Sequence, residues 1–278
     1  MENYSVLLSV YYKEKPEYLE NSIESIMNQT VVTNDFVIVK DGNLTKELDI
    51  VIDYYEKKYP DIISIKSLNQ NVGLGKALNY GLQFCKNRIV ARMDSDDISY
   101  KDRFEKQLKV FEENPGVVLV GSWIDESFDM VNVITRRIVP ENNNTIIEFS
   151  KKRCPVNHVS VMFIKNAVET AGGYLECHYN EDYYLWVRMI ENKAVFYNVQ
   201  ESLVLVRIGR EMYKRRGGYR YFKSELFIQK YMFKHNQISI FTLTYNVLIR
   251  FFIQVILPPI VRGYVFKKIA RKAKKING

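Results

Sequence analysis

Three carboxylates, Asp94, Asp96 and Asp97, crowd into four consecutive residues. They follow the short apolar run 89–91, which predicts a buried strand, so the acidic stretch lies where the chain leaves a sheet. Like charges at this spacing raise one another's pKa unless a cation lies among them. Carboxylate oxygens at a strand end are ligands that Mg²⁺ and Mn²⁺ prefer, so the stretch predicts a divalent metal site. The alternative is a solvated acidic turn, with Ser99 as the N-cap of the helix that follows.

A second carboxylate pair, Glu181 and Asp182, opens a segment whose apolar residues recur at helical spacing. At a helix start such a pair either complements the helix dipole or does acid–base chemistry, where a general base removes a proton from an attacking hydroxyl. His158 is either a core histidine or an active-site hydrogen bonder. Trp186, one turn after the pair, is expected in the core, with stacking on a sugar ring as the alternative.

Strand-like and helix-like segments alternate from the start of the chain to about residue 123. Strands are expected at residues 6–10, 36–39, 62–66, 89–91 and 117–120, with apolar residues at helical spacing between them. This alternation predicts a parallel sheet with right-handed crossovers, which binds ligands beyond the carboxyl ends of its strands. Tyr11, Asp41, the loop 69–75 and the stretch 94–97 all follow strands at that edge. Their common placement favours a binding site over an acidic turn.

Two further features fit a nucleotide diphosphate at this edge. Asp41 has the oxygens to accept hydrogen bonds from a base or a ribose, and Arg215 and Arg216, followed by two glycines, offer cationic contacts to phosphates. Each has an ordinary alternative, because an aspartate after a strand often only forms a turn and an Arg-Arg-Gly-Gly run often lies in solvent. Their placement together with residues 94–97 supports the site.

The second half of the sequence is less regular. Residues 131–138 alternate weakly, as in an antiparallel strand, and residues 159–164, 195–199 and 203–206 are strand-like. From Tyr219 onward the chain is expected to form helices. This second half therefore predicts a small antiparallel element and a C-terminal helical appendage beside the parallel sheet.

The net charge of +8 on the 278 residues, 47% of them hydrophobic, comes from the end of the chain. Residues 226–278 hold ten Lys and Arg and no Asp or Glu, which leaves 30 basic and 32 acidic residues before them. A basic, aromatic-rich tail predicts an anionic membrane surface or a nucleic acid as its neighbour. Residues 262–275 interleave apolar residues with seven basic ones, which favours a helix in a membrane interface. Nucleic acid is not expected; the alternative is a helix packed on the body.

The expected compartment follows from what the sequence lacks. No apolar run reaches the roughly 20 residues that span a bilayer. The start of the chain lacks the basic n-region of a signal peptide. Three widely spaced cysteines, Cys85, Cys154 and Cys177, imply neither a disulfide framework nor a metal cluster, and so a reducing compartment. We expect a cytoplasmic protein that lies peripherally on the inner face of the membrane.

Several motifs together resemble family 2 glycosyltransferases of the GT-A fold. They span residues 4–190 and occur in the same order and spacing as in that family: SVLLSVYYKEKPEYLENSIESIMNQT, VIVKDG, NQNVGLGKALNYGL, ARMDSDDISYKDRFEKQ and GGYLECHYNEDYYLWVRM. The later VRIGREMYKRRGGYRYFKSEL resembles bacterial capsule, exopolysaccharide and O-antigen enzymes of the family. The resemblance implies a GT-A catalytic domain over residues 1–218, with a nucleotide-binding half to about 123 and an acceptor-binding half from 124. Residues 219–278 form the basic amphipathic C-terminal region, expected to associate with a membrane.

The resemblance also implies roles for single residues. Asp94 and Asp96 match the Asp-x-Asp metal motif, with Asp96 as the direct ligand and Asp97 as an adjacent candidate, and Asp182 matches the general base. Lys40 departs from the family, because many members have an aspartate there. The residues expected to contact the nucleotide sugar are Ser9, Tyr11, Asp41 (on uracil), Asn71, Lys76, Asp94, Arg215 and Arg216. Candidate acceptor or active-site contacts are His158, Glu181 and Trp186.

The implied reaction is an inverting transfer of one hexose (glucose, galactose or an N-acetylhexosamine) from a UDP-sugar with Mn²⁺ or Mg²⁺. The implied acceptor is a saccharide, carried by a polyprenyl diphosphate in bacterial surface polysaccharide assembly. The Gln-x-x-Arg-Trp motif of processive synthases is absent, which implies one transfer per encounter. Two alternatives stay open: a haloacid-dehalogenase-like phosphatase, because Asp94-x-Asp96 also resembles its motif, and a non-catalytic nucleotide-binding module on the membrane. The sequence identifies neither the sugar, the acceptor, the linkage nor the oligomeric state.

Overall fold

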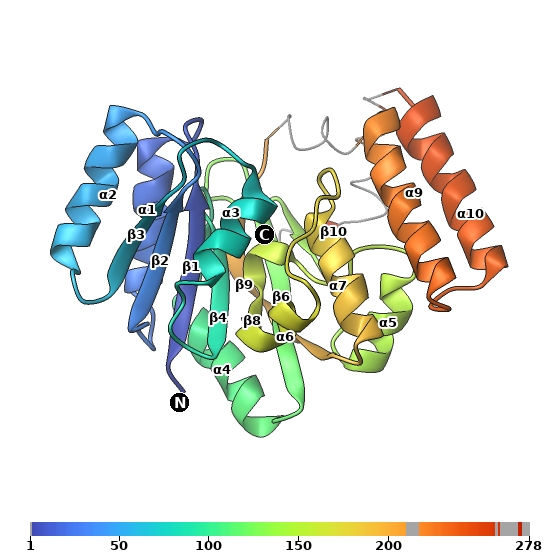
Figure 1. Ribbon diagram of the computed structural model, residues 1–278, viewed down its shortest axis with the longest axis horizontal. Helices are drawn as coiled ribbons and strands as arrows, with labels where there is room; N and C mark the ends of the chain where they lie inside the picture. Colours follow the sequence, from blue (N-terminus) through green and yellow to red (C-terminus); the bar gives the residue numbers. More distant parts are fainter. Residues whose placement is uncertain (1, 210–216, 259–260, 262–271, 274–278) are drawn as a thin grey trace, which may run out of the picture.

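The structure is a computed structural model that describes residues 2–209, 217–258, 261, 272 and 273, and Figure 1 shows its arrangement. The strands are β1 (Tyr4–Val10), β2 (Asp35–Lys40), β3 (Ile63–Ser67), β4 (Ile89–Asp94), β5 (Ile98–Ser99), β6 (Val117–Ser127), β7 (Thr135–Arg137), β8 (Met162–Ile164), β9 (Val195–Arg207) and β10 (Lys272–Ala273). The helices are α1 (Pro16–Met27), α2 (Lys46–Lys58), α3 (Leu74–Leu82), α4 (Arg103–Glu113), α5 (Asn143–Ser150), α6 (Lys165–Thr170), α7 (Glu181–Glu191), α9 (Tyr219–Lys234) and α10 (Ile240–Phe251). A 3₁₀-helix, η1 (His158–Ser160), and a π-helix, η2 (Phe252–Ile256), complete the described elements.

One mixed sheet with the order β10-β7-β6-β8-β4-β1-β2-β3 forms the centre of the molecule. Its β3-β2-β1-β4 part is entirely parallel, as the sequence predicts. These strands are apolar on both sides because helices cover both faces of the sheet. The pairing register sets Ser9 beside Asp94 and Val10 beside Lys40, so the ends of β1, β2 and β4 lie at one edge.

The rest of the sheet is mixed, and here the predicted bounds of the strands need correction. The strand expected at 117–120 extends to Ser127, and the two runs expected at 195–199 and 203–206 form the single strand β9, parallel to β6 with register shifts. The short strand β8 lies antiparallel between β4 and β6. Of the weak alternation at 131–138, only Thr135–Arg137 pairs in the sheet. The sequence of one strand does not reveal such register shifts, because they depend on how the strand pairs with its partner.

The helix after the acidic stretch begins later than predicted. Ile98–Ser99 form the strand β5 against Leu205 and Val204, so Ser99 does not cap the helix. The N-cap is Asp102, and its side chain makes no capping hydrogen bond. Instead the Ser99 hydroxyl accepts a hydrogen bond from Arg103, 2.9 Å away. Pairing with a distant strand has overridden a local capping signal.

Two apolar cores lie on the two faces of the sheet, and both draw residues from each side of residue 123. The two predicted halves therefore share one sheet and its packing, and their division stays a functional prediction. A third cluster joins α9 to α7 through Ile228 and Met232, which pack on Tyr183 and Val187. All three cysteines are free, as predicted.

The C-terminal region differs in part from the prediction. It begins with the helices α9 and α10, as expected, and these lie side by side at the end of the molecule away from α2 (Figure 1). Lys272–Ala273 pair antiparallel with β7, so the interfacial helix predicted over 262–275 is wrong at these two residues; residues 262–271 and 274–275 lie outside the described residues. Among the described residues, no helix has both the length and the hydrophobicity that crossing a bilayer requires.

Gly42 illustrates how tightly the loops that follow β2 and β3 pack against each other. It has φ +85°, and a Cβ there would lie 2.6 Å from the Asn71 backbone nitrogen. Gly42→Ala is therefore expected to lower the free energy of unfolding by about 2 kcal/mol or more. Gly116→Ala is the matched control, because a Cβ at Gly116 meets nothing within 4 Å, and its expected effect is within about 0.5 kcal/mol. Urea unfolding measures both; equal losses would contradict the packing assigned to Gly42.

Candidate active site

The first aspartate of the acidic stretch is held by a buried arginine. Arg92, only 1% exposed, donates to both carboxylate oxygens of Asp94, with 2.6 Å between Nη1 and Oδ2. The Asp94 backbone carbonyl accepts from Ser22 Oγ of α1 at 2.8 Å. About a third of the Asp94 side chain stays exposed. Asp94 is therefore oriented by the protein before any ligand arrives.

Asp97 is buried and accepts a hydrogen bond from the last residue of β9. It is 2% exposed, and its Oδ1 accepts from the Arg207 backbone nitrogen at 2.7 Å. Burial, with the charges of Asp96 and Asp94, raises the pKa of Asp97 well above its ordinary value. These contacts argue against Asp97 as an open metal ligand and give it a structural role that the sequence did not indicate.

Asp96 is the carboxylate of this stretch that the protein leaves available. No side chain of the described residues donates a hydrogen bond to it, while Arg207 Nε donates to its backbone carbonyl at 3.3 Å. Burial and the charges of Asp94 and Glu14 raise the pKa of Asp96 to about 7. Glu14, which the sequence reasoning missed, reaches the stretch by accepting a hydrogen bond from Ser95.

The residues present fit a divalent cation that shares its coordination with a diphosphate. In the part of the chain that the structure describes, no three His, Cys, Asp or Glu side chains are arranged as a metal cage. Mg²⁺ and Mn²⁺ need no such cage where one or two carboxylates and substrate phosphates supply the oxygens. Asp96, with Asp94 beside it, offers such carboxylates. A cation there would relieve the repulsion that raises the Asp96 pKa.

A buried polar network supports the strand beneath these carboxylates, and sequence reasoning did not find it. Arg103 of α4 is fully buried and donates from Nη2 to the Arg92 carbonyl at 2.8 Å and from Nε to Gln107 Oε1 at 3.0 Å. Gln107 in turn donates to the carbonyls of Val120 and Ser160. Burial and the charge of Arg92 lower the pKa of Arg103 to about 9. The network ties α4 to β4, β6 and η1.

Asp41 organises the loop that follows β3. It is 3% exposed, and its carboxylate accepts from the backbone nitrogens of Val72 at 2.7 Å and Gly73 at 3.1 Å and from Asn71 Nδ2 at 3.0 Å. These contacts fix the start of α3, whose N-cap is Gly73. Most of the hydrogen bonds that the Asp41 carboxylate can accept therefore come from the protein itself, and the Asn71 side chain donates one of them.

The second carboxylate pair begins α7, as predicted. Cys154 Sγ lies 3.4 Å from the Val156 carbonyl and 3.8 Å from Asp182 Oδ2, so its single proton has two possible acceptors. Burial together with the Asp182 charge raises the pKa of Cys154 to about 12, so the thiol keeps its proton. Burial also raises the pKa of Glu181. The thiol beside Asp182 is a contact that no sequence pattern indicated.

Tyr174 joins α3 to η1. Its hydroxyl lies 2.9 Å from His158 Nε2, and its backbone exchanges two hydrogen bonds with the Asn79 side chain of α3. Burial raises the pKa of Tyr174, and the charges of Arg92, Asp182 and Asp94 act on its phenol more weakly. Side-chain atoms of Tyr174 and Glu181 both border Gly75, so Tyr174 also lies close to the start of α7.

The remaining predicted residues have mixed outcomes. Burial and the charge of Arg92 lower the pKa of His158 well below its ordinary value, which keeps the ring neutral beside Tyr174. Trp186 is 0% exposed, so the proposed contact of its ring with an acceptor is contradicted by its burial in the core. Tyr11 and Lys76 are exposed, and Ser9 is half-buried at the same edge. Arg215 and Arg216 lie outside the described residues.

Lys40, the departure from the family pattern, is an ion-pair partner within the fold. Its ammonium lies 2.6 Å from Asp49 Oδ1 on α2, and both side chains are partly exposed. The pair joins the end of β2 to the helix that follows it. Lys40 therefore leaves the carboxylate of Asp41 to its own partners in the loop.

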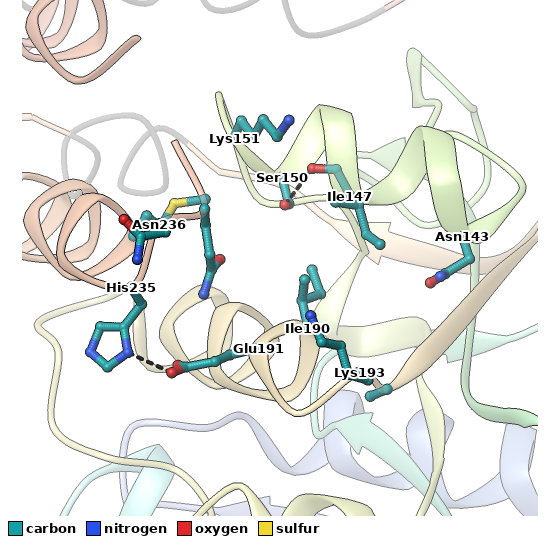
Figure 2. A pocket seen from close by; sticks show the side chains of 12 residues that line it. Asn143, Ile147, Ser150, Lys151, Ile190, Glu191, Lys193, His235 and Asn236 are labelled. Carbon is teal, nitrogen blue, oxygen red and sulfur yellow. Dashed lines mark hydrogen bonds and ion pairs between the residues drawn. The ribbon is translucent and has the colours of Figure 1, made fainter. Parts of the chain in front are cut away.

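A cavity of about 370 Å³ lies at the other end of α7 (Figure 2). Glu191 there pairs with His235, the residue that follows α9, and accepts from Tyr231 of α9 at 2.6 Å. None of the residues predicted for the site lines this cavity. Its charged groups hold α7 against α9. The candidate active site is therefore the edge of the sheet where β1, β2 and β4 end and where Asp94 and Asp96 lie, which we call the carboxylate edge.

Comparison with known proteins gives a family and relatives. The model for "Glycosyl transferase family 2" matches residues 5–168. An Escherichia coli protein named UDP-Gal:alpha-D-GlcNAc-diphosphoundecaprenol beta-1,3-galactosyltransferase is 37% identical over 270 residues, 97% of either chain. The amylovoran biosynthesis glycosyltransferase AmsE of Erwinia amylovora is 41% identical over 231 residues, 83% of this chain and 85% of that one. The structure of the mannosyltransferase PcManGT from Pyrobaculum calidifontis with GDP-Man and Mn²⁺ matches with TM-score 0.63 and 14% identity, covering 96% of this chain and 81% of that one.

The buried network makes a sharp prediction about arginine geometry. Arg103→Lys keeps the charge but loses the planar set of donors, so groups buried around it lose partners. We expect the free energy of unfolding to fall by about 3 kcal/mol. Arg88→Lys is the control, because Arg88 forms an exposed pair with Glu2, and its expected effect is below about 1 kcal/mol. Chemical denaturation compares the two; an Arg103→Lys protein as stable as the control would refute the role of the network.

Proposed function

The chain belongs to glycosyl transferase family 2, and from this premise we propose that it transfers one hexose from a UDP-sugar to a lipid-linked saccharide. In this proposal the acceptor is carried by a polyprenyl diphosphate, the transfer is metal-dependent and inverting, and the enzyme is peripheral on the inner face of the cell membrane. The observation that carries the proposal is the carboxylate stretch at the end of β4, where Arg92 orients Asp94 and no side chain of the described residues donates to the Asp96 carboxylate.

Membership of the family decides several expectations. The chain is a glycosyltransferase with the GT-A fold, and its relatives act in bacterial polysaccharide synthesis, as the motifs over residues 4–190 predicted. The phosphatase and the non-catalytic module are thereby excluded as alternatives. The likeness to the Escherichia coli enzyme supports UDP as the nucleotide and a polyprenyl diphosphate as the acceptor carrier.

Asp182 has the position of the general base. Its carboxylate removes the proton from the acceptor hydroxyl, whose oxygen attacks the anomeric carbon as the bond to the UDP oxygen breaks. A single displacement inverts the anomeric centre, so an α-linked donor gives a β-linkage. The protonated Cys154 thiol lies beside Asp182, with 3.8 Å between Sγ and Oδ2. The buried Tyr174 and the partly buried His158, both uncharged, form a hydrogen-bonded pair near the start of α7.

Asp94 and Asp96 would hold the metal and the diphosphate. A divalent cation bound there supplies positive charge to the departing UDP. Arg92 orients Asp94 for this task, and the exposed ring of Tyr11 and the hydroxyl of Ser9 lie at the same edge for the nucleotide. Arg215 and Arg216 remain candidate phosphate contacts, and Lys76 at the start of α3 is a further one.

Removing the base tests the mechanism. Asp182→Asn is expected to lower the rate of transfer about a thousandfold, since the amide accepts no proton, while binding of the UDP-sugar is retained. Asp53→Asn on α2, which replaces an exposed carboxylate far from this edge, should transfer at the rate of the natural chain. Radiolabelled transfer and equilibrium binding provide the two readouts. Full activity of Asp182→Asn would reject Asp182 as the base.

Metal dependence is tested separately. With Mn²⁺ present, one UDP-sugar is expected to raise the melting temperature by several degrees, and chelation by EDTA should remove the shift. Asp96→Asn should lose the metal-dependent part of the shift, because it removes the carboxylate that the protein leaves available. A shift that survives both EDTA and the Asp96→Asn substitution would contradict the metal site.

A further inference from the structure

The helix α10 and the π-helix η2 expose one continuous apolar face. The exposed side chains recur at intervals of three or four residues, which places them on one side: Phe241, Tyr245, Leu248, Phe252 and Ile256. Phe241 is 84% and Leu248 64% exposed. In Figure 1, α10 forms the outermost element at the end of the molecule, with α9 between it and α7. No described part of the chain covers this face.

The opposite face of the same helix is polar and buried. Asn246, Arg250 and Gln254 follow at four-residue spacing and point inward. Asn246 donates to Gln229 at 2.7 Å, while Arg250 and Gln254 both reach the carboxylate of Glu225, at 2.8 and 2.5 Å. A helix at a protein surface ordinarily turns its apolar side inward and its polar side to water. This one is inverted, and the polar contacts fix it in that orientation.

The charges around this face indicate what covers it. Glu225 is the one acidic residue of 217–258, and it forms an ion pair with Arg250. The neighbouring α9 exposes only cations among its charged side chains, namely Arg220, Lys223, Lys230 and Lys234. The sequence after 258 adds seven further basic residues and no acid. An apolar face with cationic neighbours and no free acid matches the interface of an anionic lipid bilayer. A second copy of the chain would set these cations against one another.

We propose that the outer face of α10 and η2 inserts into the interface of an anionic membrane. The proposal rests on the proposed function, in which the acceptor is lipid-linked. It also explains how the site meets that acceptor, because α9 bonds directly to the start of α7. Ser224 of α9 accepts from Asn180 at 2.8 Å, and Asn180 precedes Glu181 and Asp182. Insertion of the hairpin, which consists of α9 and α10, therefore sets the position of Asp182 relative to the membrane.

The test replaces three residues of the inserted face. Phe241→Ser, Leu248→Ser and Phe252→Ser are combined in one variant, and all three positions are exposed, so the fold should tolerate them. The matched control combines Val32→Ser, Ile50→Ser and Val131→Ser, which are exposed apolar positions outside the hairpin. Flotation uses vesicles of phosphatidylcholine with about 30% phosphatidylglycerol. We expect the first variant to bind vesicles at least about tenfold more weakly than the natural chain, and the control to bind unchanged.

Three outcomes would overturn the proposal. They are a natural chain that does not bind these vesicles, a hairpin variant that binds as well as the control, and a natural chain that forms dimers in solution which the hairpin variant abolishes. The last outcome would assign the face to a second copy. Light scattering with size-exclusion chromatography, run on the same samples, reads the oligomeric state.

A transfer assay separates failure of this proposal from failure of the proposed function. The acceptor is a saccharide diphosphate on a short, water-soluble alkyl chain or on a long chain embedded in the vesicles. We expect the hairpin variant to keep the rate of transfer to the soluble acceptor and to lose most transfer to the embedded one. Absence of transfer to either acceptor by a natural chain that binds vesicles would contradict the proposed function alone. Equal transfer by variant and control to the embedded acceptor would contradict insertion.

Discussion

The contact between Arg92 and Asp94 is the interaction on which the carboxylate edge depends. Carboxylates at 94, 96 and 97, with Glu14 beside them, lie at a partly buried place, where burial and then their mutual repulsion raise the pKa of Asp96 and of Asp97. Arg92 neutralises the first of them from below the sheet edge. A buried guanidinium costs much desolvation free energy, which only good geometry and further hydrogen bonds offset. Arg103 adds a second buried cation that bonds to the Arg92 carbonyl.

This arrangement leaves negative charge where a ligand arrives. Arg92 is committed to Asp94, and Arg103 donates to uncharged acceptors such as Ser99 and Gln107. Asp96 therefore keeps a carboxylate without a side-chain donor among the described residues. Proteins retain such an unfavourable group where function needs it, since perturbed pKa values gather at functional sites. Burial, with the charge of Arg92, lowers the pKa of His158 and keeps that ring neutral, so Arg92 acts on both Asp94 and His158.

The sequence predicted the features that depend on local pattern. The apolar runs of β1, β2 and β4 place their ends at one edge whatever the remainder does, and Glu181 begins a helix as its periodicity indicated. The misses involve partners distant in sequence. Ser99 lost its cap to pairing with β9. No local pattern indicates that the Asp41 carboxylate accepts hydrogen bonds from the loop 71–73, thirty residues away, and its contact with uracil stays a prediction. Nothing in a linear pattern distinguishes Arg103, a fully buried arginine in an amphipathic helix, from a solvated one.

The C-terminal hairpin of α9 and α10 bonds to the parts of the chain that surround Asp182. The hairpin holds two residues that lie close to Asp182, namely Asn180 and Cys154. Asn180, just before the pair, bonds to Ser224 of α9, while the buried side of α10 donates to the carbonyls of Lys151 and Lys152 and so fixes the chain leading to Cys154. The polar residues that make α10 inverted are therefore the ones that position the thiol beside Asp182. Because α10 turns its polar residues inward to bond to the chain that leads to Cys154, its apolar face points outward.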